Sequence, residues 1–372
     1  MDDNWIDVGA ADELAASPVQ RCRAGRTEIA VTCRDGQFGA VHNACNHAGG
    51  PLGDGRLDGD YLVCPWHQWK FHRMSGLGEP GFEADRIPSF PVRVVEGRVQ
   101  VNVAAASPRQ RAPHPPHPLA RPPRRTDGPT RVAGISTTVM RRDAPRYSGS
   151  EALLTSALAA ARDGGCETQL ISLDALRFHA CEGYYSKAAR ACTWPCSITQ
   201  MRADDELTAV YEALVHWADV VLVATPIRWG QASSLYFKMA ERLNCIQNQI
   251  TTHNRVLIQN KVAGFIIVGG QDNVQGVAGQ MLGFFAELGF QFPPFPYVAH
   301  SRGWSAEDME RNVAAVRDTP ELHEGAADLA RRAVETSRRL LQTVPSPAIK
   351  RGGRKAHAAP RSEHGGVGDA AS

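Results

Sequence analysis

The first 105 residues contain short apolar runs separated by polar turns, which predicts a small all-β domain. Strand-like runs occupy residues 28–33, 61–64, 91–95 and 98–103. In the last run, apolar and polar residues alternate with period two, as in a half-buried strand. Glu96 and Gly97 separate the final two runs and form a hairpin turn signal.

From residue 131 the pattern changes to apolar runs that alternate with helical stretches. Strands are predicted at 132–135, 168–173, 220–224, 262–268 and 297–299. Helices are predicted from Ser150 to Gly164, from Asp204 to Val215, and at 234–244, 277–288, after Ser305 and at 319–341. The run 220–224 is wholly apolar, as expected for a parallel strand buried on both faces.

This alternation predicts an open, doubly wound α/β fold with a parallel sheet. No G-x-G-x-x-G follows the first strand, which disfavours the Rossmann dinucleotide fold. The other doubly wound order, flavodoxin-like, places FMN at the carboxyl ends of its strands. The chain is therefore predicted to be multidomain, with an all-β domain before an α/β flavodoxin-like domain.

Two segments differ in composition from these domains. Residues 106–130 contain eight prolines, five arginines and two histidines, so we expect an extended interdomain linker that builds no core. Residues 346–372 are rich in Gly, Ala, Ser, Lys and Arg, and are expected to be disordered. The predicted domains are then 1–105 and 131–345.

Two cysteine–histidine pairs in the first domain suggest one metal centre. Cys45 and His47 form C-x-H, and Cys64 and His67 form C-x-x-H after sixteen further residues. In a Rieske [2Fe–2S] centre, one iron takes two cysteines and the other takes two histidines. Two loops that each supply one cysteine and one histidine meet this requirement. A structural zinc site is the alternative, because zinc accepts the same ligand types.

The second loop, from Cys64 to His72, resembles that of a Rieske ferredoxin, and the resemblance covers about the first hundred residues. The resemblance implies a [2Fe–2S] cluster held by Cys45, His47, Cys64 and His67. No additional cysteine follows His47 closely, and Trp66 stands where a loop disulfide partner would be. The chain is therefore similar to the ferredoxin type, which has no disulfide across its loops.

Three loops at strand ends of the α/β domain carry residues suited to a flavin phosphate and ring. The first runs from Ser136 to Glu151 and includes Arg141, Arg142 and Arg146, the second from Thr225 to Gln231, and the third from Gly269 to Asn273. Hydroxyls and backbone N–H groups at a helix N-terminus suit a phosphate. Ordinary α/β turns without a flavin are the alternative, because strand ends are only a default site.

These loops resemble those of the NAD(P)H-dependent FMN reductase and iron–sulfur flavoprotein family over about residues 131–300. The resemblance rests on 225–230, on 238–243 and on the glycine pair after the fourth strand. It implies that the first loop holds the FMN phosphate and the other two the ring. The residues predicted to contact FMN are Ser136, Ser148, Gly149, Ser150, Thr225, Pro226, Ile227, Arg228, Trp229, Gly230, Gly269, Gly270, Gln271 and Asp272.

Three cysteines lie between the second strand and the next helix, namely Cys181, Cys192 and Cys196. Iron–sulfur flavoproteins hold a [4Fe–4S] cluster in this stretch with four cysteines, and a fourth ligand here would have to be His179 or another group. We favour a redox-inactive loop over the flavin, with a disulfide as one form. A second cluster is the alternative.

Charge and cysteine usage narrow the class of protein. The first 105 residues carry a net charge of −4, residues 106–131 carry +5, and the whole chain carries +2. This distribution fits docking between redox modules better than nucleic-acid binding, although a solvated basic linker explains it equally well. Nine cysteines without a signal peptide indicate the reducing cytoplasm. No apolar run reaches the ~18 residues of a membrane span.

Together these resemblances imply an NAD(P)H-dependent, FMN-containing oxidoreductase. Electrons would pass from NAD(P)H through FMN to the [2Fe–2S] cluster and on to an external acceptor, for which a redox protein such as an oxygenase is the expectation. No side chain needs to act as nucleophile or general base. The alternatives are a flavin or quinone reductase whose Rieske domain is acceptor or redox sensor, and a non-enzymatic binding module. Family resemblance also suggests a homo-oligomer.

Overall fold

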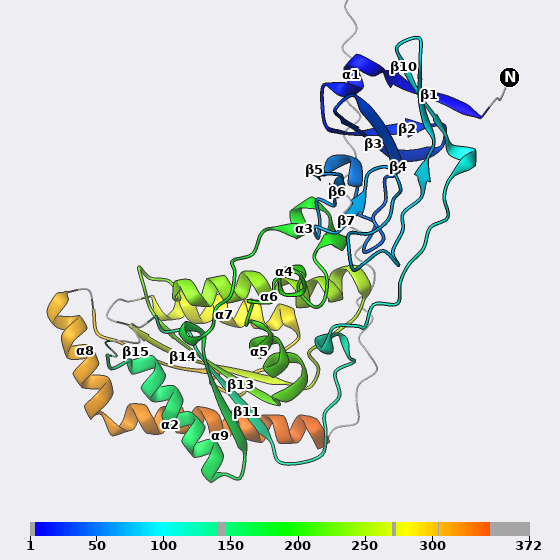
Figure 1. Ribbon diagram of the computed structural model, residues 1–372. Coiled ribbons are helices and arrows are strands. Elements are labelled where there is room, and N and C mark those ends of the chain that lie inside the picture. Colours follow the sequence, from blue (N-terminus) through cyan, green and yellow to red (C-terminus); the bar gives the residue numbers. More distant parts are fainter. Residues whose placement is uncertain (1–3, 140–143, 145, 270–272, 304, 343–372) are drawn as a thin grey trace, which may run out of the picture.

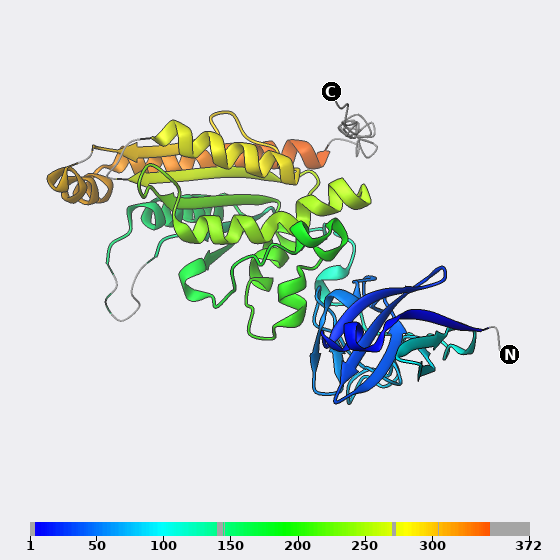
Figure 2. The ribbon, with the colours of Figure 1, turned by 90° about the horizontal axis from the view of Figure 1, so that it is seen from above.

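The structure is a computed structural model of the 372-residue chain and describes residues 4–139, 144, 146–269, 273–303 and 305–342. A β-rich N-terminal part and an α/β C-terminal part lie side by side (Figures 1 and 2). The predicted disordered tail, 346–372, lies outside the described residues.

The N-terminal part is all-β, as predicted, and consists of three small antiparallel sheets. The first contains β1 (Trp5–Ala10), β10 (Arg98–Asn102) and β9 (Val92–Val95). The second contains β2 (Val19–Ala24), β3 (Thr27–Arg34), β4 (Gln37–His42) and β8 (Ser89–Phe90), and the third β5 (Arg56–Asp58), β6 (Tyr61–Val63) and β7 (Lys70–His72). Short turns of helix, α1 (Ala11–Ala15), η1 (Leu52–Asp54) and η2 (Val103–Ala105), complete this part.

The predicted hairpin turn is confirmed. Glu96 and Gly97 have φ values of 51° and 74° and connect β9 to β10, where Val95 pairs with Arg98. Positive φ at both central residues suits the right-handed twist of the paired strands.

The C-terminal part has a five-stranded parallel sheet in the order β12-β11-β13-β14-β15. Its strands are β11 (Arg131–Ser136), β12 (Glu167–Ser172), β13 (Val220–Pro226), β14 (Val262–Gly269) and β15 (Tyr297–Ser301). This is the doubly wound flavodoxin-like order that the sequence predicted. All three central strands carry apolar side chains on both faces, so each face needs its own layer of helices.

Two hydrophobic cores cover the two faces of this sheet. On one face, α2 (Gly149–Asp163), α8 (Ala306–Asp318) and α9 (Pro320–Gln342) pack against Val220, Leu222 and Ala224. On the other face, α6 (Ser234–His253), α7 (Val274–Leu288), α5 (Thr208–Tyr211) and the π-helix η6 (Glu212–Trp217) pack against Val221 and Val223. Alternate residues of β13 thus enter alternate cores. Figure 1 shows the two helix layers, with α2 and α9 on one face of the sheet and α6 and α7 on the other.

Several predicted helix ends are wrong by a few residues or more. Ser148, not Ser150, caps α2, because its Oγ accepts from the backbone N–H of Glu151. The helix expected to begin at Asp204 begins at Thr208 and changes to a π-helix at Glu212. α6 continues to His253 rather than ending near residue 244, whereas Ser305 caps α8 as predicted.

The linker prediction needs a correction, because residues 106–130 bind both parts of the molecule. Leu119, within η3 (Pro118–Ala120), is 3% exposed and belongs to the core that contains α6. Arg109 donates to Ala44 O at 3.1 Å, and Arg125 pairs with Asp219 at 2.9 Å. Residues 106–130 therefore run along the surface as a proline-rich extended segment, and Leu119 attaches this segment to the core that contains α6.

A segment of short helices lies between the two parts. It contains η4 (Leu173–Ala175), α3 (Tyr184–Lys187), η5 (Ala189–Ala191) and α4 (Ser197–Met201). In Figure 1, α3 and α4 lie beside the third sheet of the N-terminal part. None of the helices in the described part of the chain combines the length and apolar character that crossing a lipid bilayer requires.

Candidate functional site

The structure brings the four predicted metal ligands together in pairs of like atoms. Cys45 and His47 follow β4, and Cys64 and His67 follow β6. The Nδ1 atoms of His47 and His67 are 2.9 Å apart, and the thiols of Cys45 and Cys64 form a hydrogen bond. Each loop thus supplies one member to a sulfur pair and one member to a nitrogen pair.

The protonation of His67 suits metal binding through its Nδ1 atom. His67 Nε2 lies 2.9 Å from the carbonyl oxygen of Ala191, which can only accept, so Nε2 carries the proton. The lone pair of that ring is then on Nδ1, where it faces His47. Burial and the neighbouring His67 lower the pKa of His47 to about 4, and burial also lowers the pKa of His67. Both imidazoles are neutral near pH 7.

The surroundings of the thiols suit sulfur coordinated to iron. The hydrogen bond with Cys45 and the backbone N–H groups of Trp66 and His67 lower the pKa of Cys64 to about 7. A Cβ atom on Gly50 would lie 2.8 Å from Cys64 Sγ, so only glycine leaves this space open. A pair of cysteine sulfurs and a pair of histidine Nδ1 atoms are the ligand types of a [2Fe–2S] cluster of the Rieske type.

The first strand-end loop forms a group of hydroxyls at the N-terminus of α2. Thr138 Oγ1 lies 2.8 Å from Ser148 Oγ and 3.1 Å from Ser150 Oγ. Thr138 and Ser150 are buried, and α2 has 15 residues, so its N-terminus carries a full helix dipole. Hydroxyls at this position are suited to a phosphate group. Ser136 is different, because its hydroxyl donates to the carboxylate of Glu151.

The second and third loops meet beside the first. Ser233 Oγ donates to Thr137 O at 2.7 Å, which joins the start of α6 to the first loop. Asn273 Nδ2 donates to Gly230 O at 2.7 Å, which joins the second loop to the third. Trp229 is 89% exposed with a φ of 49°, so its ring is free to cover a ligand.

The predicted FMN residues form four groups by their position in the structure. Thr225 and Ile227 are buried, and Ile227 packs against Gly269, where a Cβ atom would lie 2.6 Å from Ile227 Cβ. Arg228 exchanges backbone hydrogen bonds with Gln231 and closes the turn after Pro226. Ser148, Gly149 and Ser150 lie at the α2 N-terminus. Gly270, Gln271 and Asp272, together with Arg141 and Arg142, lie outside the described residues.

The residues predicted to contact FMN do not include Thr138 and Ser233. Both nevertheless lie in or next to the predicted loops. A hydroxyl residue directly before the helical pattern of 234–244 is an N-cap signal, and Ser233 fits that signal. The partner of Ser233 in the first loop is 96 residues away in sequence, so no local pattern could identify it.

A fourth cysteine joins Cys181, Cys192 and Cys196. Cys245, on α6, hydrogen-bonds to Cys196, and Cys192 interacts electrostatically with both Cys181 and Cys196. The hydrogen bond with Cys245 and the nearby guanidinium of Arg242 lower the pKa of Cys196 to about 5, although burial opposes this. All nine cysteines are free thiols, so the disulfide considered for this loop is not formed.

The two candidate cofactor sites lie at different positions along α6. Ser233, at its start, contacts the first flavin loop, whereas Asn248 Nδ2 donates at 2.8 Å to Ala189 O and Cys192 O beside the metal site. Fifteen residues of α-helix rise about 22 Å. The metal site and the flavin loops are therefore separated by most of this helix.

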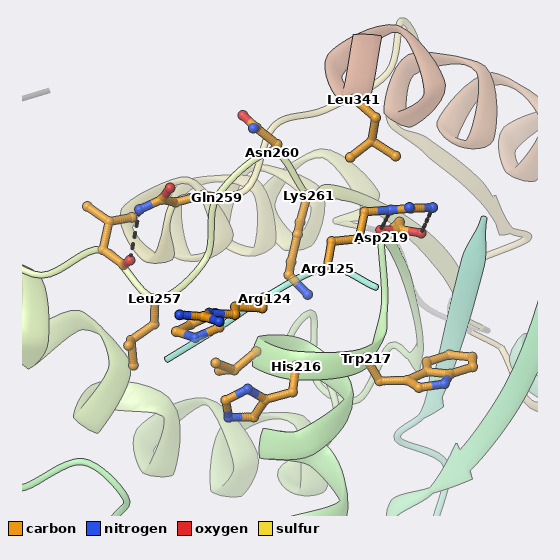
Figure 3. Close-up of a pocket in the computed structure, with 13 residues that line it drawn as sticks. Arg124, Arg125, His216, Trp217, Asp219, Leu257, Gln259, Asn260, Lys261 and Leu341 are labelled. Carbon is orange, nitrogen blue, oxygen red and sulfur yellow. Dashed lines mark hydrogen bonds and ion pairs between the residues drawn. The ribbon is translucent and has the colours of Figure 1, made fainter. Parts of the chain in front are cut away.

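A cavity of about 230 Å³ lies at the amino ends of the parallel strands, away from the three strand-end loops (Figure 3). Asp219 and Lys261, which directly precede β13 and β14, line it together with Arg124, Arg125 and His216. None of the predicted site residues lines this cavity. A second cavity, of about 390 Å³, lies between the two parts of the molecule and is lined by His67, Trp69, Phe82, Gln200 and Arg202 among others.

Two family models match separate stretches of the chain. Residues 4–91 match the family model described as the Rieske [2Fe-2S] domain, and residues 132–305 match that described as NADPH-dependent FMN reductase.

Individual relatives match one part of the chain each. Ferredoxin CarAc of Metapseudomonas resinovorans is 34% identical over 104 residues, which cover 27% of this chain and 95% of that protein. The ferredoxin component of the naphthalene 1,2-dioxygenase/salicylate 5-hydroxylase systems of a Ralstonia species is 29% identical, covering 28% and 99%. The 8-demethyl-8-aminoriboflavin-5'-phosphate synthase of Streptomyces davaonensis is 26% identical over 170 residues, covering 43% and 59%.

Among solved structures, RosB with bound 8-demethyl-8-formylriboflavin-5'-phosphate matches with a TM-score of 0.45 and 18% identity. The match covers 65% of this chain and all of that chain.

Proposed function

Because the chain belongs to the Rieske [2Fe–2S] family and residues 132–305 match the NADPH-dependent FMN reductase model, we propose an internal electron path. Electrons would pass from NAD(P)H through FMN to the cluster of the same chain and on to an external acceptor. It is an electron-transfer oxidoreductase with FMN and a [2Fe–2S] cluster as cofactors. When bound, FMN takes a hydride from NAD(P)H and releases electrons singly, and the cluster carries one electron at a time.

The protein residues position these cofactors and take no other part in the chemistry. Cys45 and Cys64 would hold one iron, and His47 and His67 would hold the other through Nδ1. Thr138, Ser148 and Ser150 would bind the FMN phosphate, because their hydroxyls are clustered at the N-terminus of α2. The exposed ring of Trp229 would cover the flavin.

One observation carries this proposal. The Nδ1 atoms of His47 and His67 lie 2.9 Å apart, the thiols of Cys45 and Cys64 interact with each other, and His67 also contacts the FMN reductase domain. A cluster in contact with a flavin domain of the same chain is suited to receive electrons from it.

An oxygenase-type protein is the acceptor that the relatives favour. Several similar ferredoxins are components of dioxygenase systems, including those of naphthalene and anthranilate dioxygenases. We propose that this chain serves such a partner and combines the reductase and the ferredoxin in one polypeptide. The nine free thiols favour the reducing cytoplasm as its compartment.

The test is an anaerobic NAD(P)H titration of the purified protein containing both cofactors, followed by absorbance and EPR. We expect flavin bleaching together with a rhombic signal of the reduced cluster. Cys45→Ser and His67→Ala should abolish the EPR signal but leave flavin reduction intact. Cys33→Ser, a half-buried cysteine outside the site, is the matched control and should keep both signals.

The second candidate is a flavin or quinone reductase whose Rieske domain is an acceptor or redox sensor. Its support is that the first loop contacts the start of α6, whereas the segment beside the metal site contacts Asn248, about 22 Å further along the helix. Rapid reduction of free FMN or quinones, with a cluster that stays oxidised over many turnovers, would support this function. That result would contradict the internal electron path.

A further inference from the structure

We propose that the FMN reductase domain completes the cluster site of the Rieske domain, by binding the outer nitrogen of His67 and thereby lowering the reduction potential of the cluster. This inference rests on the proposed function, because it requires a cluster at Cys45, His47, Cys64 and His67. It adds a role for the segment 184–197, which neither family match assigns.

The contact is built from both domains and is buried. His67 is 4% exposed, and its Nε2 atom lies 2.9 Å from Ala191 O and 3.1 Å from Ser197 Oγ. The ring of Tyr184 stacks on His67 with a centroid distance of 5.8 Å and an interplanar angle of 16°. One face and the outer edge of this imidazole are therefore enclosed by the reductase domain.

Neighbouring contacts hold the two domains in this position. Lys187 Nζ donates to Pro65 O at 3.3 Å and lies over the ring of Tyr184. Trp66, the residue before His67, packs against the core of the reductase domain that contains α6. Asn248 of α6 fixes the position of this segment, because its amide donates hydrogen bonds to Ala189 O and Cys192 O.

The direction of each hydrogen bond follows from the chemistry of its groups. Ser197 Oγ donates to Ala191 O at 2.7 Å, so its hydrogen is used there. Its oxygen can then accept from His67 Nε2–H, and it also accepts from Thr193 N at 3.4 Å. His67 thus donates one N–H to two acceptors that both come from the other domain.

This arrangement changes the donor strength of the metal ligand. A metal-binding histidine that donates its second N–H becomes a more basic ligand. A more basic ligand stabilises the oxidised, more highly charged iron, so the reduction potential falls. Loss of the acceptors should raise the potential. One electron is taken up on reduction, and no bond within the protein forms or breaks.

The two histidines therefore differ in their neighbours. His47 stacks on Trp69 of its own domain, at 5.0 Å and 8°, and is less buried than His67. His67 faces the reductase domain of the same chain, which leaves His47 as the histidine nearer to any external partner.

The experiment is a redox titration of the full-length protein with both cofactors, using dithionite and mediators and detecting the cluster by EPR. We expect Ser197→Ala to raise the midpoint potential of the cluster, because His67 loses one acceptor and Ala191 O loses a donor. Ser197→Thr keeps the hydroxyl and should restore a potential near that of the wild type. Ser186→Ala removes an exposed hydroxyl from the same segment and should leave the potential unchanged.

A second variant covers the case in which Ser197→Ala does not fold. Tyr184→Leu removes the ring that stacks on His67 without changing the charge near the cluster, and should raise the potential in the same direction by loosening the contact between the domains. Nitrogen hyperfine couplings of the histidine ligands, measured by pulsed EPR, should change with the potential in each affected variant.

The outcomes separate this inference from the proposed function. A wild-type cluster signal with an unchanged potential in both Ser197→Ala and Tyr184→Leu would overturn the inference and leave the proposed function standing. If dithionite produces no rhombic signal in the wild type, there is no Rieske cluster, and both fail.

Discussion

At the scale of single residues, Gly50 limits what the cluster site can accommodate. A methyl group there would approach Cys64 Sγ to 2.8 Å and the indole of Trp66 to 3.0 Å. Neither group can move without displacing a proposed ligand or the residues beside it. We expect Gly50→Ala to lower the iron content and to destabilise the domain by about 1–3 kcal/mol, as overpacking does.

Iron analysis and urea denaturation measure these two effects. Gly279→Ala is the matched control, because a methyl group on that α7 residue meets nothing within 4 Å. It should keep the full iron content and stabilise the helix by about 0.5–1 kcal/mol. Full iron content and unchanged stability in Gly50→Ala would contradict the close approach.

Lys261, beside the cavity in Figure 3, makes stability depend on alkaline pH. Burial lowers its pKa from 10.5 to about 8. Between these values the unfolded chain binds more protons than the folded one, so the free energy of unfolding rises as the pH increases from about 8 to about 10.5. We expect a rise of about 1–2 kcal/mol, since partial exposure reduces the effect.

Chemical denaturation at several pH values measures this dependence. Lys261→Met should be more stable than the wild type at pH 7 and should lose this rise. Equal slopes in both proteins would assign the alkaline dependence to other groups.

The four candidate cluster ligands could be predicted from the sequence, whereas the hydrogen-bond acceptors of His67 could not. The spacing of Cys45, His47, Cys64 and His67 indicates two mixed pairs, and the structure brings them together. The acceptors of His67, Ala191 and Ser197, are 124 and 130 residues away, where no spacing rule applies. Cys245 could not be predicted for the same reason, because only the packing of α6 brings it next to Cys196.

At the scale of elements, α6 carries the connection between the flavin loops and the segment that contacts the cluster. Its N-cap, Ser233, accepts from the N–H of Tyr236 and donates to Thr137 O. The same hydroxyl therefore caps the helix and fixes the first loop. Ser233→Ala should cost about 1 kcal/mol of stability through the cap, and should also weaken FMN binding.

FMN fluorescence quenching and thermal denaturation measure the two consequences. Ser305→Ala is the matched control, because Ser305 caps α8 through Asp308 N at 3.0 Å. It should lower stability to a similar extent and leave FMN affinity unchanged. Equal FMN affinity in both variants would mean that the link from Ser233 to Thr137 does not order the site.

Wholly apolar strands were predictable, whereas β1, β2 and β4, with mixed composition, and several very short strands were not. The runs that became β13 and β14 are buried throughout their centres, so their composition alone identified them. β5, β7 and β8 have three, three and two residues, which is too short for a periodic pattern. The end of α6 was misplaced because its polar residues after Asn244, such as Asn248 and Gln249, are buried by tertiary contacts.

At the scale of the whole molecule, Leu119 connects the segment between the domains to the reductase core. We expect Leu119→Ala to cost about 2–5 kcal/mol, as for other buried leucines. Its loss should also release residues 106–130 and speed tryptic cleavage at their arginines. Limited proteolysis and denaturation measure both effects.

Val94→Ala is the matched control for that substitution. Val94 is 50% exposed on β9, so the change should alter stability by less than about 0.5 kcal/mol and leave the cleavage rate unchanged. Equal cleavage of the wild type and Leu119→Ala would mean that the segment is already detached in solution.

The anchoring of residues 106–130 on both domains has a kinetic consequence. Separate ferredoxins and reductases must meet by diffusion, and charged surfaces make such encounters sensitive to ionic strength. Here a fixed segment holds the two domains against each other at a high effective concentration. Under the proposed electron path, reduction of the cluster by the flavin is first order, independent of protein dilution and only weakly affected by salt.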